Sequence, residues 1–209
     1  MRIMSFNVRV WTRDRDETSP DYWKGRLAAI LRCFRDNDPD VICLQECLPR
    51  MAKAIKGLGY KSAGVSFHHL TLVRKTMRCR RHRWRVFMDW CDVDGLRIIN
   101  VHSRWEGRVV NDVVDDITRL AAGRVAIACG DFNTTAGALS QAGLGLRHAR
   151  TELGLPERDT FQNFTKKESH GEIDHFYLNR VTPREYTVIT DNYGCPGRMS
   201  DHYPIMLTI

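Results

Sequence analysis

Short apolar segments alternate with segments of helical periodicity along most of the chain. In the first of them, MRIMSFNV, apolar and polar positions alternate loosely, which is typical of a strand with one buried face. Further strands are predicted at residues 41–44, 70–74, 84–90, 96–101, 124–129, 173–178, 185–190 and 204–209. Asp94-Gly95 predicts a hairpin turn between two of these strands.

Three segments have the spacing of amphipathic helices. Apolar residues recur at helical intervals from Trp23 to Phe34, and Asp38-Pro39 ends that helix. A second helix is predicted over residues 49–58, and a third over 109–120 with Gly123 after it. There is no internal repeat, low-complexity tract or linker, so the sequence predicts a single mixed α/β domain over residues 1–209.

Composition narrows the class of protein. With 43% hydrophobic and 27% charged residues, the chain is typical of a globular protein. No apolar run reaches the roughly 18 residues of a membrane span, and MRIMSFNVRV lacks the long apolar region of a secretory signal. The seven cysteines lack paired CxxC spacing, which argues against a disulfide framework. We therefore expect a cytoplasmic protein with no membrane span, and we infer no obligate protein partner.

The net charge of +7 comes from one short segment. Residues 74–85, RKTMRCRRHRWR, hold seven Arg or Lys and no acid, and the rest of the chain has equal numbers of basic and acidic residues. Such a segment suits a phosphate-rich partner such as nucleic acid, which makes Arg80, Arg81 and Arg83 candidate substrate contacts. The alternative is a solvated hairpin whose arginines protect a sheet edge.

Polar side chains occur repeatedly where a predicted strand begins or ends. In the stretch ACGDFNTTAG, Asp131 and Asn133 would share one face of an extended chain, and taken alone they could form an Asx-rich turn. The repetition favours an active site instead, because functional groups concentrate on loops held by a rigid scaffold. The set comprises Asn7, Glu46, His102, Asp131, Asn133, Asp174, Asp201 and His202.

The chemistry of this set indicates phosphate-ester hydrolysis. Carboxylate and amide oxygens with imidazole, and no cysteine cluster, suit Mg²⁺, Mn²⁺ or Ca²⁺ better than zinc. Magnesium commonly binds through one or two carboxylates together with a substrate phosphate. Histidine and asparagine beside such an ion can hold phosphoryl oxygens and position an attacking water.

Six motifs, in this order and spacing, resemble those of the endonuclease/exonuclease/phosphatase superfamily, which has the deoxyribonuclease-like fold. They are SFNVR at 5–9, LQE at 44–46, NVHS at 100–103, GDFN at 130–133, EIDHFYL at 172–178 and SDHYPI at 200–205. The resemblance covers almost the whole chain. It implies a four-layer α/β sandwich: two mixed β-sheets packed face to face, with helices on both outer faces and the active site at one end.

The resemblance also implies roles for the matching residues. Glu46 would be the principal metal ligand, with Asn7 close by and Asp201 completing or supporting the metal shell. Asp131 would orient or deprotonate the attacking water, and Asn133 would fix that geometry or contact the phosphate. The ion expected is Mg²⁺, with Mn²⁺ as a substitute.

The histidines are assigned to the substrate phosphate. His202 and His102 would contact its oxygens, and Asp174 would pair with His202 and raise its pKa. Arg9 and Arg104 follow Asn7 and His102 closely and are further candidates for phosphate contact. His175 would face away from the site on a strand, which favours a supporting role.

Three functions remain open. The first is a metal-dependent nuclease that cleaves phosphodiester bonds of DNA, or of RNA. The second is a phosphatase or phosphodiesterase acting on small-molecule, inositol or lipid phosphoesters, since the family includes both kinds of enzyme. The third, a binding module without chemistry, is disfavoured because every expected metal and histidine position is filled.

Overall fold

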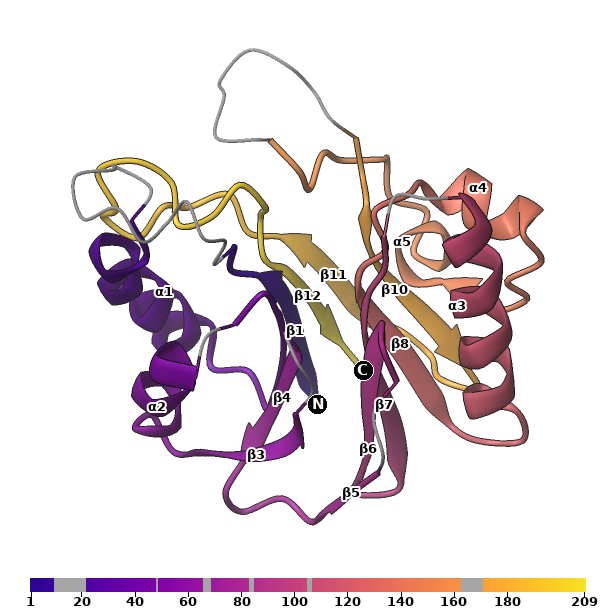
Figure 1. The fold of residues 1–209 in the computed structure, drawn as a ribbon, viewed down its shortest axis with the longest axis horizontal. Coiled ribbons are helices and arrows are strands. Elements are labelled where there is room, and N and C mark those ends of the chain that lie inside the picture. The colour runs from indigo at the N-terminus through magenta and orange to yellow at the C-terminus, as the bar shows by residue number, and fades with distance from the viewer. Residues whose placement is uncertain (10–21, 48, 66–68, 83–84, 105–106, 163–170) are drawn as a thin grey trace.

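The computed structural model describes residues 1–9, 22–47, 49–65, 69–82, 85–104, 107–162 and 171–209. Two six-stranded β-sheets pack face to face (Figure 1). The first sheet has the strand order β11 (Glu185–Val188), β12 (Ile205–Thr208), β1 (Arg2–Asn7), β2 (Val41–Gln45), β4 (His69–Arg74) and β3 (Tyr60–Val65). The second has the order β5 (Cys79–Arg81), β6 (Met88–Val93), β7 (Leu96–His102), β8 (Ala126–Asp131), β10 (Asp174–Asn179) and β9 (Arg147–His148).

Helices cover the outer face of each sheet. The helices α1 (Trp23–Asn37) and α2 (Pro49–Lys56) lie outside the first sheet, while α3 (Gly107–Ala121), α4 (Ala136–Gln141) and α5 (Ala149–Glu152) lie on the side of the second (Figure 1). Both sheets are mixed: β1 pairs with β2 in parallel and with β12 antiparallel, and β7 pairs with β8 in parallel and with β6 antiparallel. The predicted four-layer α/β sandwich is confirmed. Among the described helices, none is long and apolar enough to span a membrane.

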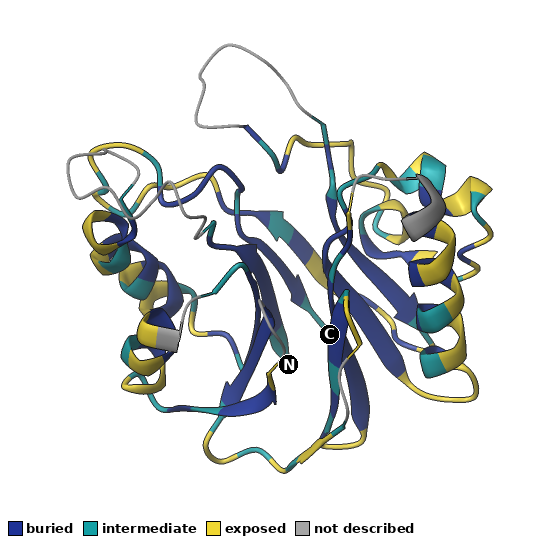
Figure 2. Cartoon of the chain, viewed as in Figure 1, coloured by how far each residue is buried: buried dark blue, intermediate teal, exposed yellow. Residues whose placement is uncertain are grey.

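The strands are apolar on both faces because each sheet is covered on both sides. Ile3 and Val41 point between the two sheets, whereas their neighbours Met4 and Ile42 pack against the helices of the first sheet. The second sheet has its own outer core, in which Ile117 of α3 is one of the buried residues. Figure 2 accordingly shows buried strands and helices whose outer faces are exposed. The core therefore consists of three apolar layers, which fix the two sheets relative to each other.

The sequence-based elements differ from the structure in a few places. The strand expected at 84–90 begins at Met88, and Val86 is 71% exposed, while Trp84 lies outside the described residues. The strands β3, β5 and β9 and the helices α4 and α5 were not predicted. Each is short or lacks clear alternation, so neighbouring strands and helices, rather than local periodicity, define them.

Candidate active site

The strand topology brings distant polar residues to one edge of the two sheets. Asn7 ends β1 and pairs with Gln45, the residue before Glu46, while His102 ends β7 and pairs with Asp131 at the end of β8. Because β1 and β2 are parallel, and β7 and β8 are parallel, these four ends meet at the same edge. Asp174 begins β10, which runs antiparallel to β8, and is paired with Asp131. The edge therefore carries groups from both sheets.

Asn7 links two carboxylates across the sheets. Its Nδ2 donates to Oε1 of Glu46 at 3.1 Å and to Oδ2 of Asp131 at 2.9 Å. Its Oδ1 accepts from the backbone N–H of Arg9 at 3.0 Å. Since carboxylates can only accept and a backbone N–H can only donate, these contacts fix the orientation of the Asn7 amide. Asn7 thus holds Glu46 and Asp131 close together.

Asp131 lies between two imidazoles. Its Oδ2 is 3.7 Å from Nε2 of His102 and 3.6 Å from Nε2 of His202. His102 Nε2 is also 3.7 Å from Oε1 of Glu46. The other oxygen of Asp131, Oδ1, accepts from the backbone N–H of Asn133 at 2.8 Å. One buried carboxylate is thereby oriented by its own loop and faces both histidines.

A second carboxylate holds His202 from the opposite side. Nδ1 of His202 lies 2.9 Å from Oδ2 of Asp174, and both residues are buried. Burial by itself lowers the pKa of His202, but the charges of Asp174 and Asp131 outweigh it, and the net effect is a raised pKa. The ring of Phe161 packs against that of His202 with centroids 4.8 Å apart. The two carboxylates therefore favour the imidazolium form of His202, whose Nε2 faces Asp131.

Three residues of this site have a left-handed backbone. Arg9, Glu46 and Asn133 have φ values of 39°, 55° and 51°. Such conformations cost about 1–3 kcal/mol for residues other than glycine, and they persist only where surrounding contacts enforce them. Asn133 is enforced by its bond to Asp131 and by its Nδ2, which donates to the carbonyl of Ser103 at 2.9 Å. The loops that carry Asn133, Glu46 and Arg9 are thus held in conformations that their contacts must maintain.

Gly130 allows β8 to approach β7 closely beside these groups. Its φ is 143°, and a Cβ at this position would collide with the carbonyl oxygen of Val101. The flanking residues His102 and Asp131 are register partners. A glycine is therefore required for these two side chains to lie side by side.

Asp201 and Arg9 form an ion pair at the border of the site. Nη1 of Arg9 bonds to Oδ2 of Asp201, and the hydroxyl of Ser200 donates to the carbonyl of Asn7 at 2.7 Å. Asp201 was expected to complete or support a metal shell and Arg9 to contact phosphate. The structure brings both to the site, but paired with each other.

The remaining predicted contacts, Arg104 and the arginines of the basic segment, differ in how near they lie to these groups. Arg104 is exposed, and its guanidinium is 5.9 Å from the ring centroid of Phe87. Arg80 lies opposite Asp92, which pairs with Arg97, five residues before His102 on β7. The strand rise makes that separation roughly 17 Å, and Figure 1 shows β5 at the lower end of the sheets. The structure therefore does not bring Arg80 to the site.

Arg81 and Arg83 share that region of the chain. Nε of Arg81 donates to the carbonyl of Ser62 at 2.9 Å, so this arginine links β5 to β3 of the other sheet. Arg83 lies outside the described residues. Arg80 and Arg81 are thus separate from the convergent polar groups.

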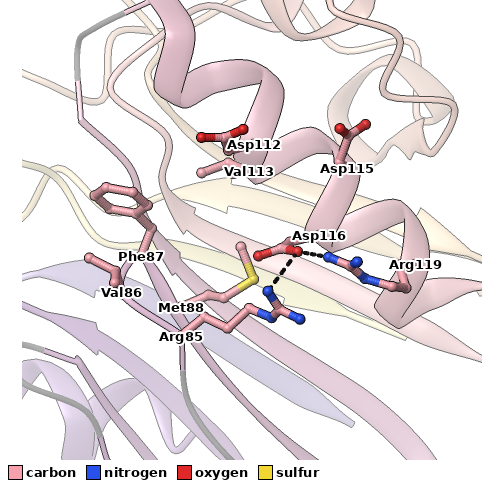
Figure 3. Close-up of a pocket in the computed structure, with 9 residues that line it drawn as sticks. All are labelled: Arg85, Val86, Phe87, Met88, Asp112, Val113, Asp115, Asp116 and Arg119. Carbon is pink, nitrogen blue, oxygen red and sulfur yellow. Dashed lines mark hydrogen bonds and ion pairs between the residues drawn. The ribbon is translucent and has the colours of Figure 1, made fainter.

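A surface pocket adjoins the site between the start of β6 and α3 (Figure 3). Asp116 pairs there with both Arg85 and Arg119, so the charges in the pocket partly neutralise each other. Its link to the site is Phe87, whose carbonyl accepts from the backbone N–H of His102 at 2.9 Å. This pocket contains none of the candidate site residues named above. We therefore place the candidate active site at the ends of the strands, not in this pocket.

Several supporting residues were not foreseen from the sequence. Arg26 of α1 is fully buried and donates to the carbonyls of Val8 and Arg9, which fixes the loop after β1. Thr160 Oγ1 accepts from the backbone N–H of Asp174 at 3.0 Å. Only Arg26 gave a signal: it lies three residues after Trp23, on the apolar face of its helix.

The chain has many structural relatives. It resembles the mannosyl-6-phosphatase Bt3783 of Bacteroides thetaiotaomicron VPI-5482 with a TM-score of 0.79 and 21% identity, over 100% of this chain and 98% of that one. TDP2 of D. rerio, complexed with a single-strand DNA product, gives a TM-score of 0.75 and 18% identity over 99% and 97% of the two chains. A functionally unknown conserved protein of Enterococcus faecalis V583 gives 0.79 and 17% over 100% and 98%.

These likenesses establish the fold. No curated protein sequence matches the chain. The sequence profile described as "Endonuclease/Exonuclease/phosphatase family", however, matches residues 4–202, nearly the full length. The chain therefore belongs to the endonuclease/exonuclease/phosphatase family.

Proposed function

We propose that the protein is a divalent-metal-dependent phosphoesterase, and that a phosphodiester bond of nucleic acid is the first substrate to test. The observation that carries this proposal is the convergence of Glu46, Asp131 and His202 at one edge of the sheets, within a chain of the phosphoesterase family. These residues are distant in sequence, and only the fold brings them together.

The carboxylates fit a hard divalent cation. Oε2 of Glu46 is buried and has no hydrogen-bond partner among the described residues, which is costly for a carboxylate unless a ligand supplies one. Glu46 would hold the ion, with Asn7 keeping the carboxylate in place through its other oxygen and Asp201 in support. When bound, Mg²⁺ or Mn²⁺ would neutralise charge on the phosphoryl oxygens and lower the pKa of a coordinated water.

The chain's own groups account for the remaining steps. Asp131 would accept a proton from the attacking water, because its Oδ2 points into the site while its Oδ1 is fixed by the loop. His202, held protonated by Asp174, would donate to a phosphoryl oxygen and stabilise the charge that develops in the transition state. His102 would contact a second oxygen, and Asn133 would keep Asp131 oriented.

A small phosphoester is the second candidate substrate. The placement of Arg80 roughly 17 Å from His102 along the strands favours it, since this arginine would not contact a short substrate in the site. One protein of similar fold is described as a mannosyl-6-phosphatase, and another is complexed with a single-strand DNA product. The basic segment could still contact a long nucleic acid that extends beyond the site.

A substrate panel tests the proposal. Duplex, single-stranded, abasic and RNA oligonucleotides would be compared with sugar, inositol and lipid phosphates, each with Mg²⁺, Mn²⁺ or EDTA. We expect hydrolysis of at least one phosphoester that stops in EDTA and is restored by Mg²⁺. Hydrolysis of small phosphoesters alone would reject the nuclease proposal, and EDTA-resistant turnover or no turnover would reject the phosphoesterase proposal.

A further inference from the structure

Two buried histidines form a hydrogen-bonded chain behind the candidate site. Nε2 of His175 lies 2.9 Å from the carbonyl oxygen of Thr134, and its Nδ1 lies 3.1 Å from Nε2 of His148. Nδ1 of His148 lies 3.2 Å from the hydroxyl of Thr151. His175 has no exposed surface and His148 is 8% exposed. The chain thus runs from the loop after β8 through β10 and β9 to α5.

Only one arrangement of protons satisfies every member. The carbonyl of Thr134 can only accept, so His175 must carry its proton on Nε2. Burial lowers the pKa of His175 to about 3 and that of His148 to about 4, which keeps both rings neutral. Nδ1 of His175 is then an acceptor, Nε2 of His148 is its donor, and the hydroxyl of Thr151 donates to Nδ1 of His148. All donors point toward the loop.

The hydrogen-bonded histidines end at Thr134, which lies next to a residue of the candidate site. Thr134 follows Asn133, whose φ of 51° is enforced by contacts with Asp131 and Ser103. His175 also has its ring 5.6 Å from that of Phe132, in an edge-on arrangement. Both neighbours of Asn133 are thereby held from the side opposite the site, and a loose Thr134 would release the strained backbone.

The same residues include the donor types of a metal site, but their bonding is that of a network. His148, His175 and Glu172 lie close enough to share an ion. However, Nε of Arg150 donates to both oxygens of Glu172, at 2.9 and 2.8 Å. A second cation beside this guanidinium would be repelled. The ring nitrogens also already have matched donors and acceptors.

We infer that His175 and His148 are positioning residues for the active-site loop 131–134, acting through the carbonyl of Thr134. This inference rests on the proposed phosphoester hydrolysis for its catalytic consequence. Its structural part, the tautomers and the fixed loop, can be measured without any substrate.

The experiment uses substitutions of matched length. His175→Met and His148→Met remove the donors, whereas His175→Gln and His148→Gln keep a side-chain N–H of similar reach. We expect His175→Met to lower kcat roughly tenfold, with KM changed less than about twofold. His175→Gln should keep most of the wild-type kcat. In the substrate-free protein, amide exchange of Asn133 should accelerate in the Met variants and not in the Gln variants.

Ring nitrogen shifts from NMR report the tautomers directly. Protonation of Nε2 on both histidines is expected. Protonated Nδ1 on either ring, unchanged Asn133 exchange in His175→Met, or a stoichiometric metal ion lost on His148→Met would overturn the inference. If the wild-type protein hydrolyses no phosphoester, the proposed function fails, whereas the exchange and tautomer measurements still decide whether the chain positions the loop.

Discussion

His202 and Asp174 form a buried pair in which Nδ1 of the imidazole lies 2.9 Å from Oδ2 of the carboxylate. The bond fixes which ring nitrogen faces the site: Nε2, which lies 3.6 Å from Oδ2 of Asp131. The two carboxylates on opposite sides of the ring favour the imidazolium. The arrangement thus favours a positively charged donor at a buried position, next to a carboxylate that could act as a base.

Asp174→Asn is expected to lower kcat/KM by about 100-fold or more, since one preorganised donor is typically worth about 3–4 kcal/mol in the transition state. A histidine with a raised pKa is protonated at low pH and loses its proton as pH rises through the folded-state pKa. Without the Asp174 charge that pKa falls, so the alkaline limb of the kcat/KM profile should move to lower pH.

The pH–rate profile of Asp174→Asn, compared with that of the exposed Asp115→Asn, measures this shift. Asp115 lies on α3, so its variant should match the wild type. An unchanged alkaline limb in Asp174→Asn would show that His202 does not act as the proposed imidazolium.

Much of this fold could be predicted from the sequence because its strands are either clearly alternating or continuously apolar. The segment ending at Asp131 is an example: its buried run, its glycine and its polar end are all visible in the sequence. The residues of the candidate site could likewise be named from the polar positions at strand ends. Neighbouring parallel strands end on the same side of a sheet, so such residues lie close together.

Long-range placement could not be predicted in the same way. Arg80 was a reasonable candidate from charge alone, but the register of β5 against β6 puts it far from the site. His148 and His175 are 27 residues apart, and their 3.1 Å contact depends on the pairing of β9 with β10. A strand of two residues has no periodicity, so such a contact leaves no local signal in the sequence.

Glu46→Gln is expected to weaken Mn²⁺ binding by at least about tenfold and to abolish turnover. The glutamine can still accept from Asn7 through Oε1, but it removes the negative charge and replaces the buried Oε2. Isothermal titration calorimetry with MnCl₂ measures the affinity without substrate. Glu185→Gln, at an exposed position on β11, is the matched control. Equal Mn²⁺ affinity in Glu46→Gln and the control would remove Glu46 as the ligand.

Arg80→Ala is expected to affect only long substrates. A dinucleotide or small phosphoester bound at His102 would not reach a side chain roughly 17 Å away along the strands. If the protein binds long nucleic acid, losing one phosphate contact should reduce the salt dependence of binding by about one unit of slope. Filter binding at several salt concentrations measures this slope.

Arg104→Ala is the companion variant, since Arg104 lies only two residues beyond His102. It should raise KM for short and long substrates alike. Slower hydrolysis of a dinucleotide by Arg80→Ala, beside an unaffected Arg104→Ala, would contradict this arrangement of the substrate.

Asp89, between the two sheets, should make stability depend on pH. It is 2% exposed, Thr71 donates to its Oδ1 at 2.6 Å, and its Oδ2 has no hydrogen-bond partner among the described residues. Burial raises the pKa of Asp89 from 3.8 to about 7, although the bond from Thr71 opposes this. The folded protein therefore holds a proton on Asp89 at pH values where the unfolded chain has lost it.

The direction of this pH dependence follows from the linkage between proton binding and folding. Between the unfolded pKa of 3.8 and the folded pKa of about 7, the native state binds more protons, so the free energy of unfolding falls as pH rises. Above the folded-state pKa, the stability that the bound proton contributes is fully lost. Asp89→Asn lacks this titration and keeps the acceptor for Thr71. Its stability relative to the wild type should therefore increase by about 2.5 kcal/mol between about pH 5 and pH 8.

Urea unfolding of the wild type, Asp89→Asn and the exposed Asp115→Asn across this pH range gives the three profiles. The profile of Asp115→Asn should run parallel to that of the wild type. If the profile of Asp89→Asn were also parallel, Asp89 would have to keep an ordinary pKa, and its carboxylate would have to be solvated or bound between the sheets in the folded protein. Its buried Oδ2 would then have a partner, and the space beside Gly64 would be the place to look for it, because Gly64 packs directly against the Asp89 carboxylate.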